Sequence, residues 1–524
     1  MKMHRHAMPG IREEELSIIA GDRELTFADL GARASKAAGG LAALGVGEDD
    51  SVALMLRNDF ALFEANVAAG MLGAYAVPMN WHATADEAGY ILRDCAAKVL
   101  VVHADLLPQI MSGIPASARV FVVPTPAEIA TAYHVTAEAA ALPVGRESWS
   151  DFVAASPPLA VPPKISRGSM IYTSGTTGRP KGVRRKPPTQ EQMDAVAQQI
   201  GVLWGLLPDP TAVALMNGPM YHSAPAGYGM SAIRHQMTTV LQPRFDAEDM
   251  LRLIEKYRVT HMHIVPTMFV RLLRLPDAVK RKYDLSSLRN VTHGAAPCPP
   301  DVKRAMIAWW GPVINEYYGA TETGIVVWNT SAQALLKPGT VGKPVEGAVV
   351  RVVDEQGRDV KQGEVGEIYV RAPNLSDFTY NNADEKRREV ALGDLVTVGD
   401  VGYQDADGYV FLCDRKRDMI ISGGVNIYPA EIESVLIQMP GVRDCAVFGI
   451  PDEEFGEQIC AHIEPLAGTL LDATAVRAFL GERLARYKVP KVVELCAALP
   501  REDSGKIFKR KLRAPYWEKA GRRI

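Results

Sequence analysis

The chain lacks the features of a disulfide scaffold, a structural zinc site or a membrane-spanning segment. Its 524 residues include six cysteines, and no two of them form a C-x-x-C pair or a zinc-like spacing. No run of about 18 apolar residues occurs. The opening stretch MKMHRHAMPGIREEE has no apolar core of a secretory signal. We therefore expect reduced cysteines and no transmembrane segment.

The sequence also lacks an excess of charge of one sign. It has 61 acidic and 58 basic residues, a net charge of −3, so no basic field attracts nucleic acid. Hydrophobic residues make up 47% and charged residues 23%, which excludes a disordered or fibrous chain. The length exceeds a typical domain of about 150 residues, so we expect more than one domain.

Helix and strand patterns alternate along the first 150 residues, which predicts a mostly parallel sheet covered by helices. Thr26 can cap the first helix. Between 340 and 412 the pattern changes to short strands separated by turns, and after 418 two helices, two strands and a basic tail follow. The predicted fold class is α/β, with a large N-terminal domain of helix-covered, mostly parallel sheets and a small β-rich subdomain, plus a small α+β C-terminal domain.

A glycine- and hydroxyl-rich loop, YTSGTTGRPKGV, lies at residues 172–183 after an apolar, strand-like segment. Glycines let backbone N–H groups surround an anion, hydroxyls donate to phosphate oxygens, and Lys181 adds a positive charge. The spacing is not that of a Walker A loop, and Pro180 precedes the lysine. An ordinary surface linker would rarely carry these residues in this order, so we interpret the segment as a phosphate-binding loop.

Six further segments follow in order along the chain. They are GPMYHSAP at 218–225, HGAAP at 293–297, NEYYGATETG at 315–324, TVGD at 397–400, DRKRDMIISGGVNIYPAEIE at 414–433 and PREDSGKIFKR at 500–510. Together with the phosphate-binding loop they resemble the signature set of adenylate-forming enzymes, the superfamily of acyl-CoA synthetases, peptide-synthetase adenylation domains and luciferases. The chain looks most similar to bacterial fatty-acyl-CoA ligases.

The resemblance implies an ATP site with Mg²⁺. Tyr318 offers a flat face for adenine, and Asp400 and Arg415 would contact the ribose, although TVGD has one valine more than the usual T-G-D. Glu322 and Thr177 would hold Mg²⁺. Catalytic roles fall to Lys506, Glu322, His222 and Thr177. The residues assigned to ATP are Thr173, Ser174, Gly175, Thr176, Thr177, Lys181, Gly294, Ala295, Ala296, Asn315, Tyr317, Tyr318, Gly319, Thr321, Asp400, Arg415 and Lys506.

The resemblance also implies an acyl site, a CoA site and a hinge. Arg417 stands at the hinge, where Asp or Lys is more usual, and it would divide an ATP- and acyl-binding domain, 1–416, from a mobile lid domain, 417–524. His222 could instead be a packed core histidine, and Lys488 and Lys491 could instead belong to an ordinary helix end. The acyl residues are Tyr221, His222, Gly227, Tyr228 and Met268; the CoA residues are Gly423, Gly424, Lys488 and Lys491.

The expected activity is an ATP-dependent ligation of a carboxylic acid to CoA, through acyl-AMP and with release of pyrophosphate and then AMP. No acidic residue follows His222 until Asp246, so a substrate ammonium group would lack a partner and free amino acids are disfavoured. An apolar, methionine-containing wall favours a medium- or long-chain or bulky apolar acid.

Three alternatives stay open. The first is an adenylating enzyme that loads a separate carrier protein or stops at acyl-AMP. The second is an aryl, 4-coumarate-type CoA ligase, and the third is a non-catalytic binding protein on the same scaffold. The expected partners are a small carboxylic acid and CoA, without nucleic acid; a homodimer is left open. The need for ATP and CoA suggests a cytoplasmic location.

Overall fold

The computed structural model describes residues 16–173, 179–206, 209, 211–501 and 507–519. They form two compact units. The first contains residues up to 295 together with 305–325 and 372–391, and the second contains 296–304, 326–371 and 392 onward. The expected boundary between residues 416 and 417 lies inside the second unit and stays a prediction.

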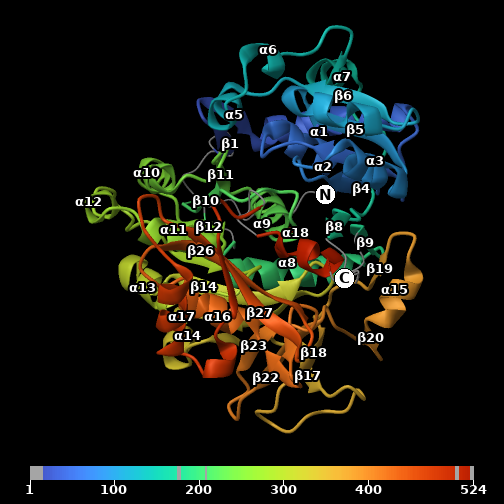
Figure 1. The fold of residues 1–524 in the computed structure, drawn as a ribbon. Helices are drawn as coiled ribbons and strands as arrows, with labels where there is room; N and C mark the ends of the chain where they lie inside the picture. The colour runs from blue at the N-terminus through green and yellow to red at the C-terminus, as the bar shows by residue number, and fades with distance from the viewer. Residues whose placement is uncertain (1–15, 174–178, 207–208, 210, 502–506, 520–524) are drawn as a thin grey trace. The chain divides into compact units, whose positions relative to one another are not determined.

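The N-terminal part of the first unit is a parallel five-stranded sheet in the order β4-β3-β5-β6-β7. Its strands lie among helices α1, α2, α3 and α7 (Figure 1). Thr26 caps α1 as predicted, because its hydroxyl accepts from the Asp29 N–H at 3.0 Å. The elements are α1 (Phe27–Ala43), β3 (Ser51–Met55), α2 (Phe60–Met71), β4 (Tyr75–Pro78), α3 (Ala85–Asp94), β5 (Ala97–His103), β6 (Arg119–Val123), β7 (Glu147–Ser148) and α7 (Trp149–Ala155).

The rest of the first unit contains the strand order β2-β1-β11-β10-β12-β13-β14, parallel except for the β1–β2 pair. Parallel strands end at the same edge, which is where ligands bind in open α/β sheets. The bounds are β1 (Ser17–Ala20), β2 (Arg23–Thr26), α8 (Gln190–Trp204), β10 (Val213–Met216), α9 (Ser223–Arg234), β11 (Thr238–Leu241), β12 (His261–Ile264), α11 (Pro266–Leu273), β13 (Asn290–His293), α13 (Pro300–Trp310) and β14 (Ile314–Ala320).

The second unit contains short antiparallel strands, as predicted for 340–412. A second sheet, β25-β24-β27-β26 with β28, packs apolar side chains against α16 and α17. The α/β fold class is therefore confirmed. The elements are β16 (Thr340–Pro344), β17 (Val349–Val353), β18 (Gly366–Arg371), β22 (Asp400–Gln404), β23 (Val410–Arg415), β24 (Ile420–Ser422), β25 (Val425–Ile427), α16 (Pro429–Leu436), β26 (Val442–Asp452), β27 (Gly456–Pro465), α17 (Ala473–Gly481) and β28 (Val492–Leu495).

The predicted basic tail is instead helix α18, Lys509–Lys519. The ammonium group of Lys509 lies 2.7 Å from the carboxylate of Glu433 on α16. The indole N–H of Trp517 donates to the Gly449 carbonyl at 3.1 Å. Burial lowers the pKa of Lys509, but the neighbouring carboxylates more than offset this and raise it. These contacts give the charged segment a packed face, which the charge pattern did not reveal.

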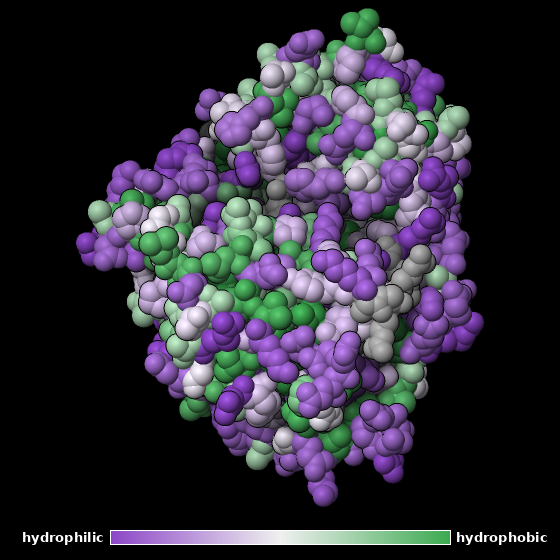
Figure 2. Space-filling model, in the orientation of Figure 1, coloured by the Kyte–Doolittle hydropathy of each residue, from purple (hydrophilic) through white to green (hydrophobic). Residues whose placement is uncertain are grey.

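No helix in the described ranges is both long and apolar enough to cross a membrane. Figure 2 shows hydrophilic residues spread over the visible face, with hydrophobic residues between them. This distribution agrees with the mixed composition of the chain.

Candidate functional site

The segment after β14 carries two of the predicted site residues, Thr321 and Glu322, and Arg185 fixes its backbone. The Arg185 guanidinium donates to the carbonyls of Thr321 at 2.6 Å and Glu322 at 3.1 Å, and to the carbonyl of Ser376 at 3.0 Å. Burial lowers the pKa of Arg185 to about 10. The sequence around Arg185 gives no local sign of this role, because the role depends on contacts with residues more than a hundred positions away.

Tyr380 connects Glu322 with Lys181. It lies on β19 (Phe378–Tyr380), which pairs with β9 (Lys181–Arg185). Its hydroxyl donates to the Glu322 carboxylate at 3.1 Å, and the Lys181 ammonium lies 5.1 Å from the centre of its ring. Burial, and then the Glu322 charge, raise the pKa of the Tyr380 phenol. The structure thus brings the predicted phosphate lysine to the ring of Tyr380 and the predicted Mg²⁺ ligand to its hydroxyl.

Two paired strands, β8 (Ile171–Thr173) and β9, flank the predicted phosphate-binding segment in the sequence. β8 and β9 are antiparallel, and Thr173 lies opposite Lys181. The Tyr172 hydroxyl donates to the Asp94 carboxylate at 2.5 Å, which fastens the hairpin to the end of α3. Five predicted site residues lie outside the described residues: Ser174, Gly175, Thr176, Thr177 and Lys506.

Helix α9 begins directly after His222, which is its N-cap. The Thr321 hydroxyl donates to the hydroxyl of Ser223, the first residue of α9, at 2.9 Å. The buried Tyr221 ring meets Trp81 edge-on, with 4.7 Å between ring centres. The predicted acyl residues Tyr221 and His222 are therefore brought to the same part of the first unit as Thr321.

A buried amide clamps the segment before His222. The Asn58 side chain donates to the Gly218 carbonyl at 2.8 Å and accepts from the Met220 N–H at 3.1 Å. Asn58 is only 5% exposed, so these bonds form away from water. The role of Asn58 could not be predicted from the sequence, because its partners lie about 160 residues further along the chain.

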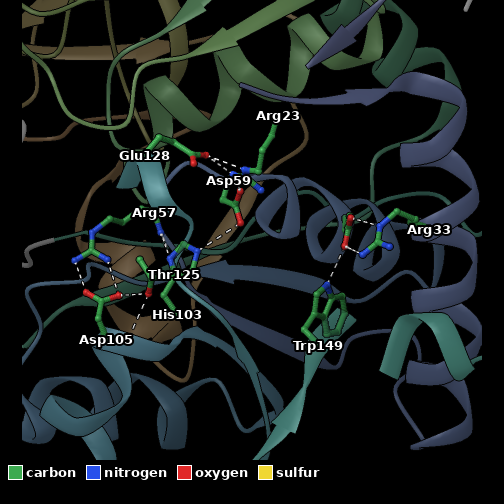
Figure 3. A network of polar contacts seen from close by, with 10 residues as sticks. Arg23, Arg33, Arg57, Asp59, His103, Asp105, Thr125, Glu128 and Trp149 are labelled. Atoms are coloured by element: carbon green, nitrogen blue, oxygen red, sulfur yellow. Dashed lines mark hydrogen bonds and ion pairs between the residues drawn. The ribbon is translucent and has the colours of Figure 1, made fainter. Parts of the chain in front are cut away.

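The residues on either side of Asn58 belong to a polar network (Figure 3). The Arg57 N–H donates to His103 Nδ1 at 3.1 Å, so His103 presents its other nitrogen to the Asp59 carboxylate, 3.5 Å away. The Arg23 guanidinium donates to Asp59 at 2.6 Å. Burial alone would raise the pKa of Asp59, but His103 and Arg23 lower it to about 2. The network fixes the turn that carries Asn58.

Four buried rings, from Trp204, Tyr228, His263 and Tyr317, form an aromatic group beside β12 and β14. Trp204 lies 5.4 Å from Tyr228, 6.5 Å from His263 and 6.4 Å from Tyr317 between ring centres. His263 Nε2 lies 3.1 Å from the Tyr317 hydroxyl. Burial lowers the pKa of His263 to about 4 and raises the pKa of both tyrosines.

Residues predicted for the ATP and acyl sites lie next to this aromatic group. A side chain on Gly294 would begin 2.6 Å from the Tyr317 ring, so only glycine fits there. Ala295 follows in a left-handed conformation, φ 66°, which is strained for alanine. A Cβ on Gly227 would lie 3.6 Å from the Trp204 ring.

Most of the remaining predicted acyl and ATP residues lie on helix α11 and strand β14. Met268 is buried on α11. Asn315 donates to Asn290 at 3.3 Å, and Tyr318 is buried on β14. A Cβ on Gly319 would lie 2.0 Å from the Gly324 carbonyl oxygen, so this turn requires glycine. Ala296 belongs to the second unit.

Asp400 and Arg415 face each other in the second unit. They are register partners on β22 and β23, with 3.4 Å between Arg415 Nε and the Asp400 carboxylate. Asp400 is buried and Arg415 is partly exposed. Arg417 follows in a turn, and its carbonyl accepts from Arg513 of α18 at 3.4 Å.

The predicted CoA residues differ in their surroundings. Gly423 and Gly424 form the turn between β24 and β25, both with positive φ. Lys488 is paired with Glu431, 2.6 Å away, whereas Lys491 is half-exposed, 3.8 Å from Asp452. The ion pair with Glu431 gives Lys488 a structural role that does not depend on a CoA phosphate.

Among the residues that the structure describes, no group of three or more His, Cys, Asp or Glu side chains could hold a metal ion. Mg²⁺ does not require such a group, because it commonly binds one or two carboxylates together with substrate phosphates and water. Glu322, which accepts a hydrogen bond from Tyr380, offers one such carboxylate and fits that donor set.

Two family models match this chain. The model of the AMP-binding enzyme matches residues 9–377, and the model of the AMP-binding enzyme C-terminal domain matches residues 431–506.

Relatives with full-length matches act on different acids. The feruloyl-CoA synthase of Amycolatopsis sp. is 36% identical over 95% of each chain. The long-chain-fatty-acid–CoA ligase FadD13 of Mycobacterium tuberculosis is 32% identical over 94% of each chain. The crystal structure of ATP-bound MatB from Rhodopseudomonas palustris has a TM-score of 0.81 at 29% identity, covering 96% of each chain.

Proposed function

We propose specific roles for the residues of this chain, which belongs to the AMP-binding enzyme family, in the ligation of a carboxylic acid to CoA. The chain is an enzyme of this family, and ATP and CoA are its co-substrates. The observation that carries the assignment is the arrangement of Lys181, Tyr380 and Glu322, with Arg185 holding the backbone of Thr321 and Glu322. Lys181 supplies a cation from the predicted phosphate-binding segment and Glu322 supplies a carboxylate, and both contact Tyr380, which supports the proposal.

In the first step, an oxygen of the substrate carboxylate attacks the α-phosphorus of ATP. The bond from this phosphorus to the bridging oxygen breaks, and pyrophosphate leaves. The carboxylate and the triphosphate repel each other, so catalysis depends on positioned positive charge. Lys181 and the loop from Thr173 to Thr177 would hold the departing pyrophosphate, and Lys506 would hold the carboxylate and the bridging oxygen.

Each nucleoside contact is proposed for its residue separately. Tyr318, Gly294, Ala295 and Ala296 would border adenine, and Asp400 with Arg415 would contact the ribose hydroxyls, because a carboxylate can accept two hydrogen bonds. Asn315 and Gly319 complete this set. Glu322 and Thr177 would hold Mg²⁺, which supplies charge neutralisation when it is bound.

In the second step, the CoA thiol releases its proton to water, and the sulfur attacks the carbonyl carbon of acyl-AMP. The carbon–oxygen bond to AMP breaks, and acyl-CoA forms. We propose that the lid domain, 417–524, turns at Arg417 between the two steps, so that Lys506 leaves and Gly423 and Gly424 enter. Lys491 is the better placed of the two predicted lysines for a CoA phosphate, because Lys488 is paired with Glu431.

The acyl end would lie along α9, with His222 at its start, Tyr221, Gly227 and Tyr228 nearby, and Met268 on α11. The contacts of Tyr317 with Trp204 and His263 favour the acyl end for this residue as well. Residues 223–234 contain no acidic side chain, so an ammonium group on the acid would have no partner on α9, which disfavours amino acids. The relatives include ligases of fatty acids and ligases of aryl acids, so they support either class of acid as the substrate.

The test is AMP release by the purified protein with ATP, Mg²⁺ and a panel of short, medium, long, aryl and steroid-type acids, each with and without CoA. We expect AMP release to rise with CoA for one acid class, with the matching acyl-CoA as product. Pyrophosphate exchange that CoA does not affect would instead indicate an enzyme that loads a carrier protein or releases acyl-AMP.

A further inference from the structure

The aromatic group of Trp204, Tyr228, His263 and Tyr317 contains two polar atoms that the fold does not use. Trp204 Nε1 and the Tyr228 hydroxyl are buried and have no hydrogen-bond partner among the described residues. The two side chains are neighbours, with 5.4 Å between ring centres. Trp204 is 4% exposed and Tyr228 is 1% exposed, so water does not solvate them from the surface.

Such atoms are rare in native proteins and call for an explanation. The other two members of the group do not share this property, because His263 Nε2 and the Tyr317 hydroxyl lie 3.1 Å apart and satisfy each other. The unused hydrogen-bonding capacity is therefore concentrated on the side of Trp204 and Tyr228. An indole N–H can only donate, and a phenol can both donate and accept.

The aromatic group adjoins the proposed reaction site within the same unit. The Tyr317 ring lies against Gly294 at the end of β13, and four residues after Tyr317 the chain reaches Thr321. Tyr228 lies on α9, whose first residue Ser223 accepts from Thr321. An acid activated near Thr321 would therefore extend its tail along α9 toward the aromatic group.

We propose that this enzyme activates aryl acids whose ring carries an oxygen substituent, which receives hydrogen bonds from Trp204 Nε1 and the Tyr228 hydroxyl. This inference rests on the proposed function and names its acid. A planar ring adds edge and face contacts to a group of rings already spaced for them. An aliphatic tail would bury the same two donors without partners.

The charge state of the aromatic group disfavours a second carboxylate on the tail of the acid. Burial keeps His263 neutral at pH 7, because its pKa is lowered to about 4, and keeps both tyrosines protonated. None of the four side chains therefore offers a positive charge to a second carboxylate on the tail. A dicarboxylic acid would place an unpaired charge among them, which is costly.

The test compares kcat/KM for benzoic, phenylacetic and cinnamic acids, each with and without ring hydroxyl or methoxy groups, and for octanoic and decanoic acids. We expect at least one oxygenated aryl acid to exceed its unsubstituted parent and both aliphatic acids by about tenfold. Tyr228→Phe and Trp204→Phe should each remove most of that preference.

Trp310→Phe is the matched control. Trp310 Nε1 is also buried without a partner, but its ring packs on Phe269 and is not part of the aromatic group. This variant should keep the wild-type preference. The Tm of the free Tyr228→Phe protein should equal or exceed that of the wild type, because an unpaired buried hydroxyl is removed. This Tm measurement distinguishes the loss of a substrate contact from misfolding of the variant.

Two results would overturn the inference while leaving the proposed function intact. One is a preference for decanoic acid or for the unsubstituted rings. The other is an oxygenated-ring preference that survives in Tyr228→Phe and Trp204→Phe. AMP release with none of the acids, with or without CoA, would count against the proposed function itself.

Discussion

The Tyr380 phenol donates a hydrogen bond to the Glu322 carboxylate, with 3.1 Å between the oxygens. This bond orients the only carboxylate that we assign to Mg²⁺. Tyr380→Phe should therefore raise the Mg²⁺ concentration for half-maximal pyrophosphate exchange and lower kcat/KM for ATP about tenfold, since a hydrogen bond to a charged acceptor contributes about 1.5–3 kcal/mol. Thioester formation from supplied acyl-AMP should be unchanged. An unaltered Mg²⁺ titration would show that the tyrosine only packs there.

Asn58 offers a test of how the acyl site is positioned. Asn58→Ala removes both hydrogen bonds to the 218–220 segment, so we expect a loss of about 1–3 kcal/mol in unfolding free energy and a raised KM for the acid. The KM for ATP should change little. Asn329→Ala is the control, because Asn329 is also buried and donates to a backbone carbonyl, that of Thr340 in the second unit. A raised acid KM in both variants would argue for a general structural effect.

Stability should fall as the pH is lowered from about 6.5 to about 4. Burial lowers the pKa of His261 and of His263 to about 4 in the folded protein, below the value near 6.5 of an unfolded histidine. The unfolded chain therefore binds more protons in this window, and each histidine costs about 1.4 kcal/mol per pH unit there. Urea unfolding of wild type and His263→Gln at pH 7 and pH 5 checks this. The variant should lose less stability over that interval; equal losses would contradict the assignment.

Asp59 should affect the free energy of unfolding in a lower pH range than the two histidines. Its folded pKa of about 2 lies below the ordinary value of 3.8, so its contribution is present above about pH 4 and is lost as the pH falls toward 2. The shift corresponds to about 2 kcal/mol at neutral pH. Asp59→Asn should lower the unfolding free energy by this order at pH 7 and by much less at pH 2.5. The same loss at both pH values would indicate packing and not charge.

Features that depend on local sequence could be predicted. Thr26 forms the cap that its position suggested, and Thr84 with Glu87 makes a capping box that fixes the start of α3. Glycine positions could be predicted too, since Gly294 and Gly319 leave no room for a side chain. Such requirements arise within a few residues or from backbone geometry, and therefore appear in the sequence.

Features that depend on distant contacts could not be predicted. Arg185, Tyr380 and Asn58 hold parts of the site through partners far along the chain, and their residue types are common on any surface. The pairing of Lys488 with Glu431 is similarly a product of the fold. The unpartnered donors of the aromatic group also become visible only when burial is known.

The most direct test of the central claim follows the oxygen atoms of the substrate. The acid is labelled with ¹⁸O in both carboxylate positions and incubated with ATP, Mg²⁺ and CoA, and AMP and acyl-CoA are examined by mass spectrometry. Attack on the α-phosphorus predicts that AMP carries one ¹⁸O and the thioester keeps the other. Unlabelled AMP, or label in inorganic phosphate with ADP as product, would contradict the account.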